Sequence, residues 1–392
     1  MSRGTRLTTK IWYSDGPGSP RTPPDAAARL AGCSSEDLIV TLGWTLERPL
    51  WLDESAAAVR TVLAGYGLAR AVNDGRIVPL SARLSAVPSL IAHDQPDVAV
   101  VSGISRGSTY AFGAAVGWAD VLASTARAVV VEVDPDGVDL GAPEITGNIV
   151  ATVTRPPGFG VATAASRPAD QIDLHIGALV SSLLPDEPTL QFGPGGIGEG
   201  IALALRRPVR IWSGLVTESM AGLHQRGLLL EPVVAAYAWG GEPITALARA
   251  GMLRLCSSTI THDISRLSDI ARLIGCNTAL QVGLEGAVNV ERVGSRVIAA
   301  IGGHADFCVG ASRSIGGLAV IAVRSTAADG SSTIVPTVDV VSTARADVQV
   351  VVTEHGIADL RGLVDRDRAQ RLIAIAAPQH RHYLQRHFEA ER

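Results

Sequence analysis

Lysine is almost absent from this chain of 392 residues: Lys10 is the only one, and arginine supplies the other basic side chains. A Schiff base needs a lysine amine, and a P-loop needs a lysine against the phosphates of its nucleotide. Because Lys10 lies in the N-terminal segment, away from any glycine-rich loop, neither kind of chemistry is expected.

Cysteine is also scarce. The four cysteines, Cys33, Cys256, Cys276 and Cys308, are irregularly spaced and form no C-x-x-C pair. This spacing indicates neither a disulfide framework nor a zinc cluster, so no metal site is expected. We expect buried, reduced thiols, as in a cytoplasmic protein.

Runs of one charge and long apolar runs are missing as well. The net charge is −4 with both signs interspersed, which argues against a surface for nucleic acid. No run approaches the roughly 18 apolar residues of a membrane span, and residues 1–16 lack the apolar stretch of a signal peptide. We therefore expect a cytoplasmic protein with small-molecule partners and no membrane partner.

Apolar residues, by contrast, make up 47% of the chain, which is enough for a large core and, at this length, for two or more domains. Short β-branched runs at 37–43, 97–103 and 128–134 alternate with helical stretches rich in alanine and leucine. This alternation predicts an α/β fold with a mostly parallel sheet that is covered on both faces.

Proline, glycine and small residues gather in the segment 154–170 between two patterned regions. Such a composition is typical of an inter-domain linker. We therefore predict an N-terminal domain at 1–160 and a C-terminal domain at 161–392.

The clearest local unit is TLQFGPGGIGEGIALAL, which starts at Thr189 and predicts a strand, a glycine loop and a helix. Glycines let a backbone approach a ligand closely, and the free N–H groups at a helix start stabilise a phosphate or an oxyanion. Gly193, Gly195 and Gly198 also match G-x-G-x-x-G, but the next strand ends at 212–214 without the acid that would hold a ribose. An anion cradle, a dinucleotide site and a tight turn without a ligand all stay open.

A second glycine cluster, AAIGGHADFCVGASRSIGG at 299–317, is expected to join a strand to a helix of small residues. Its candidates for lining a pocket are Gly302, Gly303 and Gly310. Asp306 is expected to cap the turn, with an Asx-turn at a domain joint as the alternative. His304 is a candidate base, although a lone histidine is a weak signal.

Near the C-terminus, VQVVVTEHGIADLRG predicts a buried strand and a turn that contains Glu354 and His355, before an amphipathic helix. The two side chains are a candidate acid–base pair. Entry into the helix is the alternative explanation, because adjacent side chains usually point apart.

Four segments in the same order resemble consensus blocks of the acetyl-CoA hydrolase/acetate CoA-transferase family, which includes 4-hydroxybutyrate CoA-transferases. They are LQFGPGGIGEGI, GGHADFCVGASRSIGG, TEHGIADLRG and RAQRLIAIAAPQHRHYL. The resemblance covers most of the chain and is most specific at 277–384. It implies two tandem open α/β domains of the CoA-transferase (NagB/RpiA-like) type, with the active site between them and usually in a homodimer.

The resemblance also implies a reaction in which a glutamate attacks an acyl-CoA and forms an acyl-glutamyl anhydride, then a glutamyl-CoA thioester. A coenzyme A thioester would be the substrate, carboxylates would be the other small-molecule partners, and no cofactor would be permanently bound. By resemblance, the residues at the CoA thioester or its oxyanion are Gln191, Gly193, Gly195, Gly196, Asn289, Gly302, Gly303, Asp306 and Gly310.

The sequence departs from the family pattern at the nucleophile. The family block resembles G-I-H-T-E-x-x-S-D-G, and the segment RIWSGLVTES places Gly214 on the glutamate and Glu218 on the aspartate. With a helix resuming after Gly214, Glu218 would lie one turn away, about 6 Å along the axis. Glu218 is therefore a candidate substitute nucleophile or base, and a first-turn helix acid is the alternative.

A second departure lies in NTALQVGLEGAVNVE, where Gln281 and Gly283 stand in place of two family acids while Glu291 is retained. Lost carboxylates change the charge of a pocket that handles carboxylate substrates. These changes predict a CoA site that is kept but altered in its reaction.

Three functions remain open on the sequence. The first is an acyl-CoA hydrolase or CoA-transferase with a displaced carboxylate; the second is a CoA-ester-binding protein that has lost catalysis. The third, supported only by G-x-G-x-x-G, is a nucleotide-dependent oxidoreductase. The sequence does not identify the acyl group, although Trp212 favours a larger or less polar one.

Overall fold

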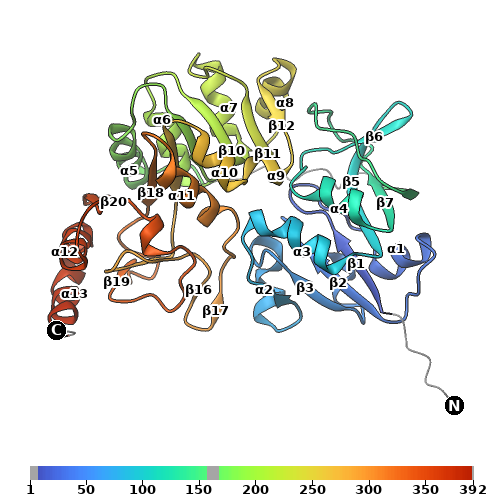
Figure 1. The fold of residues 1–392 in the computed structure, drawn as a ribbon, viewed down its shortest axis with the longest axis horizontal. Coiled ribbons are helices and arrows are strands. Elements are labelled where there is room, and N and C mark those ends of the chain that lie inside the picture. Colours follow the sequence, from blue (N-terminus) through green and yellow to red (C-terminus); the bar gives the residue numbers. More distant parts are fainter. Residues whose placement is uncertain (1–7, 157–166, 391–392) are drawn as a thin grey trace. The chain divides into compact units, whose positions relative to one another are not determined.

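The computed structural model describes residues 8–156 and 167–390, and the chain divides into two compact units (Figure 1). Unit 1 contains residues up to 163 and a later segment, 235–260. Unit 2 contains 164–234 and all that follows 260. The sequence-based division at residue 160 did not include the return of 235–260 to the first unit.

The predicted linker, 154–170, lies largely outside the described residues. The functional domains at 1–160 and 161–392 therefore stay a prediction.

Unit 1 is built around a sheet with the order β4-β3-β2-β1-β5-β7-β8, in which neighbouring strands are parallel, and β6 pairs antiparallel with β5. The elements up to residue 156 are β1 (Thr9–Tyr13), α1 (Pro24–Leu30), β2 (Leu38–Leu42), β3 (Ala58–Thr61), α2 (Ala69–Asn73), β4 (Val78–Pro79), α3 (Val87–Asp94), β5 (Val98–Arg106), β6 (Thr109–Ala111), α4 (Ala119–Thr125), β7 (Ala128–Val133) and β8 (Ile149–Thr154). The returning segment contributes most of β11 (Val233–Trp239), with α8 (Glu242–Arg249), β12 (Leu253–Leu255) and α9 (Ser258–Thr261).

The valine-rich runs of β5 and β7 explain this sheet. Residues 98–101 and 129–131 are all 0% exposed, as expected for parallel strands that are covered on both faces. The predicted α/β class with a parallel sheet is confirmed.

Unit 2 contains a second open sheet, in which the strands of this unit follow the order β10-β9-β13-β18-β20-β21. Strand β9 is parallel to β10 and β13, and β18 is parallel to β13 and β20, whereas β20 and β21 are antiparallel. A smaller sheet joins β14 to β15 and β19. The elements are α5 (Gln171–Ser182), β9 (Thr189–Phe192), α6 (Gly196–Ala204), β10 (Arg210–Thr217), α7 (Glu218–Gln225), α10 (Ile264–Asp269), β13 (Leu273–Asn277), β14 (Gln281–Gly283), β15 (Val288–Asn289), β16 (Arg292–Val293), β17 (Arg296–Val297), α11 (His304–Arg313), β18 (Leu318–Ala322), β19 (Ile334–Val335), β20 (Val350–Thr353), β21 (Gly356–Asp359), α12 (Asp365–Ile375) and α13 (Pro378–Ala390).

The start of α5 anchors this unit. Asp170 and Asp173 form a capping box, and both carboxylates also pair with Arg324. Further along, a side chain on Gly177 would meet the backbone of Gly200 at 2.3 Å, so α5 and α6 pack backbone to backbone. That close approach fixes the helix that starts at the glycine loop.

One predicted boundary is wrong: the strand after the glycine loop does not end at Gly214. Strand β10 continues to Thr217, and α7 begins at Glu218. The physical reason is that Val216 and Thr217 are β-branched and buried, which extends the strand.

Two other local expectations are corrected. Glu354 and His355 form the turn of an antiparallel hairpin between β20 and β21, and the following helix starts only at Asp365. Asp306 does not cap a turn: the N-cap of α11 is Gly303, and Asp306 is buried in the first helical turn. The small residues of this segment allow residues 305–311 of the helix to be buried.

No helix among the described residues has the length and apolar character needed to cross a membrane.

Candidate functional site

Three positions that the sequence analysis singled out, Gln191, Gly193 and Gly214, lie toward the carboxyl ends of the neighbouring strands β9 and β10. Strand β9 pairs in parallel with β10, with Leu190 opposite Ile211, and with β13, with Phe192 opposite Cys276. Three residues beyond Ile211, Gly214 stands level with Gly193. The carboxyl ends of neighbouring parallel strands are the usual ligand sites of open α/β sheets.

The glycine loop between β9 and α6 has two kinds of glycine. At Gly193 and Gly195, no atom of the described residues outside the adjoining chain lies within 4 Å of the point where a side chain would begin, and Gly195 has φ +110°. At Gly196 the same point lies 2.2 Å from the Asp173 carboxylate, and at Gly198 it lies 2.1 Å from the Gly193 carbonyl oxygen. Gly193 and Gly195 thus leave space for a ligand, whereas Gly196 and Gly198 are required by packing.

Gln191, at the end of β9, is held by a neighbour that sequence reasoning missed. Its side-chain amide donates to Asn277 Oδ1 at 3.2 Å and accepts from Asn277 Nδ2 at 3.1 Å. This reciprocal amide pair links β9 to β13. It fixes the orientation of both side chains beside the glycine loop.

Gly214 faces a buried histidine. A side-chain carbon on Gly214 would lie 2.9 Å from His262 Nε2 and 3.1 Å from its Cε1. A side-chain carbon on Gly303 would lie 2.4 Å from the same Nε2. The imidazole therefore fits between two backbone segments only because both positions are glycine, and it occupies the space into which a side chain at position 214 would project.

The environment of His262 keeps it neutral. The side chain is 2% exposed, its ring packs edge-on against Phe307 with centroids 5.1 Å apart, and burial lowers its pKa to about 3. Nδ1 lies 2.8 Å from Thr261 Oγ1. If Nδ1 carries the proton and donates it to this hydroxyl, Nε2 is the basic nitrogen, and Nε2 is the atom that faces Gly214.

Trp212 and Gly214 project from the same face of β10, because side chains alternate along a strand. The Trp212 indole N–H donates to the Thr261 carbonyl oxygen at 3.1 Å. This bond ties β10 to the backbone just before His262.

The start of α11 brings His304 close to Cys308 and Thr343. His304 Nδ1 lies 2.8 Å from Thr343 Oγ1 and 3.9 Å from Cys308 Sγ. Burial lowers the pKa of His304 to about 4. Gly310, one turn further along α11, packs against Leu267 of α10, where a side chain would lie 2.3 Å from Leu267 Cβ.

Asn289 serves the fold of a turn. Its amide donates to Gln281 Oε1 at 2.9 Å and to the Arg292 carbonyl oxygen at 2.7 Å, and its own oxygen accepts from the Glu291 backbone N–H at 2.9 Å. Glu291 in turn accepts from Ser342 Oγ at 2.7 Å. Gln281 thus supplies a neutral acceptor inside this network.

Two acids of the sequence analysis lie elsewhere. Glu218 is four residues beyond Gly214 along a chain that is extended to Thr217, so it lies about 13 Å away at 3.3 Å per residue. Glu354 accepts hydrogen bonds from the Ser325 backbone and hydroxyl at 2.9 and 2.6 Å. The structure does not bring either acid to Gly214.

The site therefore joins residues from five separate segments. Gly214, Gly303 and His262 form one group, and Gln191 and Asn277 form another. His262 carried no motif signal in the sequence, and Asn277 lies in a family segment but was not predicted as a site residue. The described residues contain no group of histidine, cysteine and carboxylate side chains suited to hold a metal ion.

The fold and the site define an α/β protein of the CoA-transferase type, and comparison with known proteins gives the family. The Acetyl-CoA hydrolase/transferase C-terminal domain matches residues 244–388. Succinyl-CoA:cyclohexane-1-carboxylate CoA transferase of Geobacter metallireducens is 30% identical over 321 residues, which cover 75% of this chain and 72% of that protein. The 4-hydroxybutyrate coenzyme A transferase of Clostridium kluyveri is 29% identical over 347 residues, covering 81% and 79%.

This chain therefore belongs to the acetyl-CoA hydrolase/transferase family. Among solved structures, the crystal structure of RipA from Yersinia pestis superposes with a TM-score of 0.81 at 23% identity and covers 98% of this chain and 94% of that one. This likeness extends the shared fold to nearly the whole chain.

Proposed function

We propose that this protein cleaves the CoA thioester of a small carboxylic acid, as an acyl-CoA hydrolase or a CoA-transferase. The relatives carry these activities in their names, and the open glycines at Gly193 and Gly195 leave space for a thioester at the start of α6. The backbone N–H groups there are suited to stabilise the oxyanion that forms when a thioester carbonyl is attacked.

Of these two reactions, we propose hydrolysis as the main one, because His262 fills the position of the family nucleophile. The observation that carries this proposal is the 2.9 Å from His262 Nε2 to the point where a side chain on Gly214 would begin. A glutamate does not fit there without displacing a buried ring. An acyl-glutamyl intermediate at this position is therefore replaced by direct attack of water.

In the proposed step, a water molecule gives a proton to His262 Nε2 as its oxygen bonds to the thioester carbonyl carbon. The resulting tetrahedral oxyanion collapses, the carbon–sulfur bond breaks, and the CoA thiolate takes the proton from the imidazolium. The products are a free carboxylic acid and CoA thiol. Burial lowers the pKa of His262 to about 3, so its imidazole is neutral at neutral pH and acts as a weak base.

Glu218 remains a second candidate for the base or nucleophile, as the sequence analysis proposed. It is the first residue of α7, where an acid also stabilises the helix dipole. Its distance along the extended chain makes His262 the better-supported choice.

The other properties of the protein are proposed from the family resemblance. We propose a cytoplasmic homodimer whose partners are acyl-CoA esters and small carboxylates, without a permanently bound cofactor. Light scattering after size-exclusion chromatography tests the dimer, and a mass near that of one chain would contradict it.

The experiment that tests the function uses acetyl-, propionyl- and succinyl-CoA, each with and without acetate. Free thiol release and the intact protein mass are followed together. Three variants are compared with the native protein: His262→Gln, Glu218→Gln, and His175→Gln as a control on the exposed face of α5. We expect thiol release without a CoA adduct, lost at least a hundredfold in His262→Gln and kept in the other two variants, as for removal of a general base.

Other outcomes separate the alternatives. A covalent CoA adduct that disappears in Glu218→Gln would establish a displaced glutamyl route and contradict the role of His262. Binding of CoA esters without any thiol release would instead establish a CoA-ester-binding protein without catalysis.

A further inference from the structure

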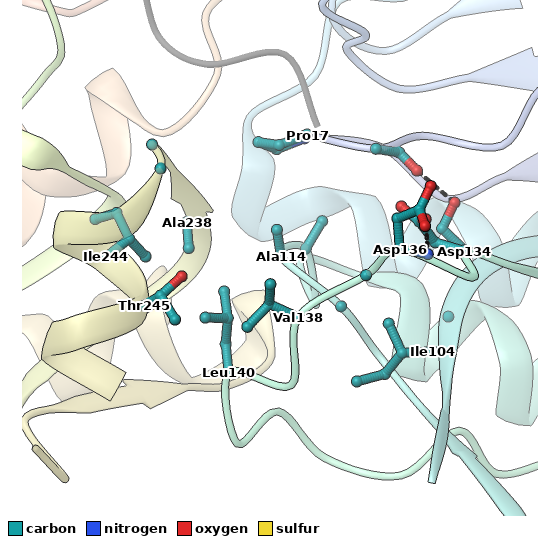
Figure 2. Close-up of a pocket in the computed structure, with 18 of the residues that line it drawn as sticks. Pro17, Ile104, Ala114, Asp134, Asp136, Val138, Leu140, Ala238, Ile244 and Thr245 are labelled. Carbon is teal, nitrogen blue, oxygen red and sulfur yellow. Dashed lines mark hydrogen bonds between the residues drawn. The ribbon is translucent and has the colours of Figure 1, made fainter. Parts of the chain in front are cut away.

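Unit 1 contains a cavity that the proposed thioester chemistry does not use. Its volume is about 370 Å³, and every residue that lines it belongs to unit 1 (Figure 2). At about 30 Å³ per water molecule, the cavity has room for roughly a dozen waters. It thus falls in the size range of pockets for small organic ligands.

The cavity lies at the carboxyl ends of the parallel strands. Its lining includes Gly18 in the loop after β1, Ser102 in β5 just before its pairing with β7 ends, Asp134 directly after β7 and Arg155 directly after β8. In the sheet order, β1 is the turning point: the chain builds outward from it through β2 to one edge, and through β5 to the other. Ligands of open α/β sheets bind at this switch point, because the loops after the two central strands diverge there.

Arg155 is present in the cavity wall, but its charge is directed into the protein. The guanidinium is 1% exposed and donates to Glu132 at 2.9 Å, to Asp134 at 3.1 Å and to Ser102 Oγ at 2.7 Å. It also donates to the Gly18 carbonyl oxygen at 2.6 Å. The arginine therefore serves to hold the loops of the sheet together and is not presented to an anionic ligand.

The remaining charged groups of the lining are acidic. Asp134 is paired with Arg155 at 3.1 Å and Glu242 with Arg249 at 2.8 Å, whereas Asp136, exposed at the edge of the cavity, has no salt bridge among the described residues. Figure 2 shows Asp134 and Asp136 together at one side. A phosphate or carboxylate would be repelled from that side, whereas an ammonium group would gain charge-assisted hydrogen bonds.

Much of the rest of the lining is apolar. In Figure 2, Ile244 and Ala238 lie across from Ile104, with Val138 and Leu140 between them. These side chains would cover a short hydrocarbon body and exclude water from it.

We propose that this cavity binds a small molecule that carries a primary amine on an apolar body. The Asp136 carboxylate would hold the ammonium group, and the aliphatic side chains would cover the hydrocarbon. This site is separate in chemistry from the CoA thioester site, because a CoA ester is anionic, and it does not depend on the proposed reaction.

The test uses three probes of nearly the same size: pentylamine, pentanol and pentanoate. Binding to the full chain is measured by isothermal titration calorimetry at neutral pH, and thiol release from acetyl-CoA is measured separately. Asp136→Asn removes the charge of an exposed residue, Ala114→Leu adds volume inside the cavity, and Glu54→Gln is the exposed control outside it.

We expect pentylamine to bind best and pentanoate worst. In Asp136→Asn, the ratio of the pentylamine affinity to the pentanol affinity should fall about fivefold, as for the loss of a partly exposed ion pair. Ala114→Leu should weaken the amine and the alcohol alike, and Glu54→Gln should change neither. Equal or tighter binding of pentanoate would overturn the proposal, as would the absence of pentylamine binding at millimolar concentration to the folded native protein. Thermal unfolding of each variant shows that it is folded, and the thiol-release assay shows whether the thioester site is intact in the same sample.

Discussion

Introducing a carboxylate by Gly214→Glu should destabilise the protein, and this added cost should largely disappear when the same substitution is made in a His262→Ala background. The first side-chain carbon would lie 2.9 Å from Nε2 of a buried ring, closer than normal packing allows. Overpacking of this kind costs typically 1–3 kcal/mol, and a carboxylate in the buried space adds to it, so about 3 kcal/mol is expected. His262→Ala alone should also cost about 3 kcal/mol, because it empties a packed site.

If the two side chains compete for one space, the double variant should not cost the sum of about 6 kcal/mol. It should cost about 3 kcal/mol, which is a coupling energy of about 3 kcal/mol between the two positions. Urea unfolding of the native protein and the three variants measures each free energy. Gly303→Ala, which meets the same Nε2 at 2.4 Å, is a matched second probe of the space.

Additive effects within about 0.5 kcal/mol, or a Gly214→Glu variant as stable as the native protein, would refute the competition between residues 214 and 262. The double variant also has a chemical readout. With the ring gone, a glutamate at position 214 has room for a CoA adduct, so intact mass after incubation with acetyl-CoA should show one in the double variant and none in the native protein.

Three further predictions concern stability. The pKa of His262 is lowered to about 3 in the fold and is near 6.5 in the unfolded chain. The contribution of His262 to the free energy of unfolding is therefore present above pH 6.5 and is lost as pH falls toward 3, by about 1.4 kcal/mol per pH unit. Between pH 6.5 and pH 5, urea unfolding should show that His262→Gln loses about 2 kcal/mol less stability than the native protein. Gly196→Ala should cost about 1–3 kcal/mol in thermal unfolding, because the added side-chain carbon would lie 2.2 Å from the Asp173 carboxylate. Gly193→Ala should change the stability by no more than about 0.5 kcal/mol and should raise the KM for acetyl-CoA. Equal stabilities of the two variants would contradict the division of the glycines into packing and ligand positions. Arg155→Met should lower the free energy of unfolding by about 3–5 kcal/mol, because it leaves the buried Glu132 without its ion-pair partner. A loss below about 1 kcal/mol in urea unfolding would show that stability does not depend on this ion pair.

Much of the fold follows from local sequence. The valine runs of β5 and β7 predict buried parallel strands, and the sequence after Thr189 predicts a strand, a glycine loop and a helix, because hydrophobic period and glycine placement act over a few residues. The end of β10 was wrongly placed at Gly214 because the prediction used local sequence alone. Serine and glycine locally favour a turn, but the buried Val216 and Thr217 keep the strand extended, and their burial is a tertiary property.

By itself, the sequence determined the α/β class and the family, and it predicts that Gly214 stands in place of the family glutamate, since each of these rests on residue types and their spacing. Only the tertiary structure decided which side chain faces Gly214. Gly214, His262 and Gly303 are distant in sequence, and their contact depends on long-range packing of β10 against the segment before α10 and the start of α11. The pairing of Gln191 with Asn277 and the cavity at the switch point of the first sheet have the same origin, because parallel strands bring together residues whose order along the chain gives no sign that they meet.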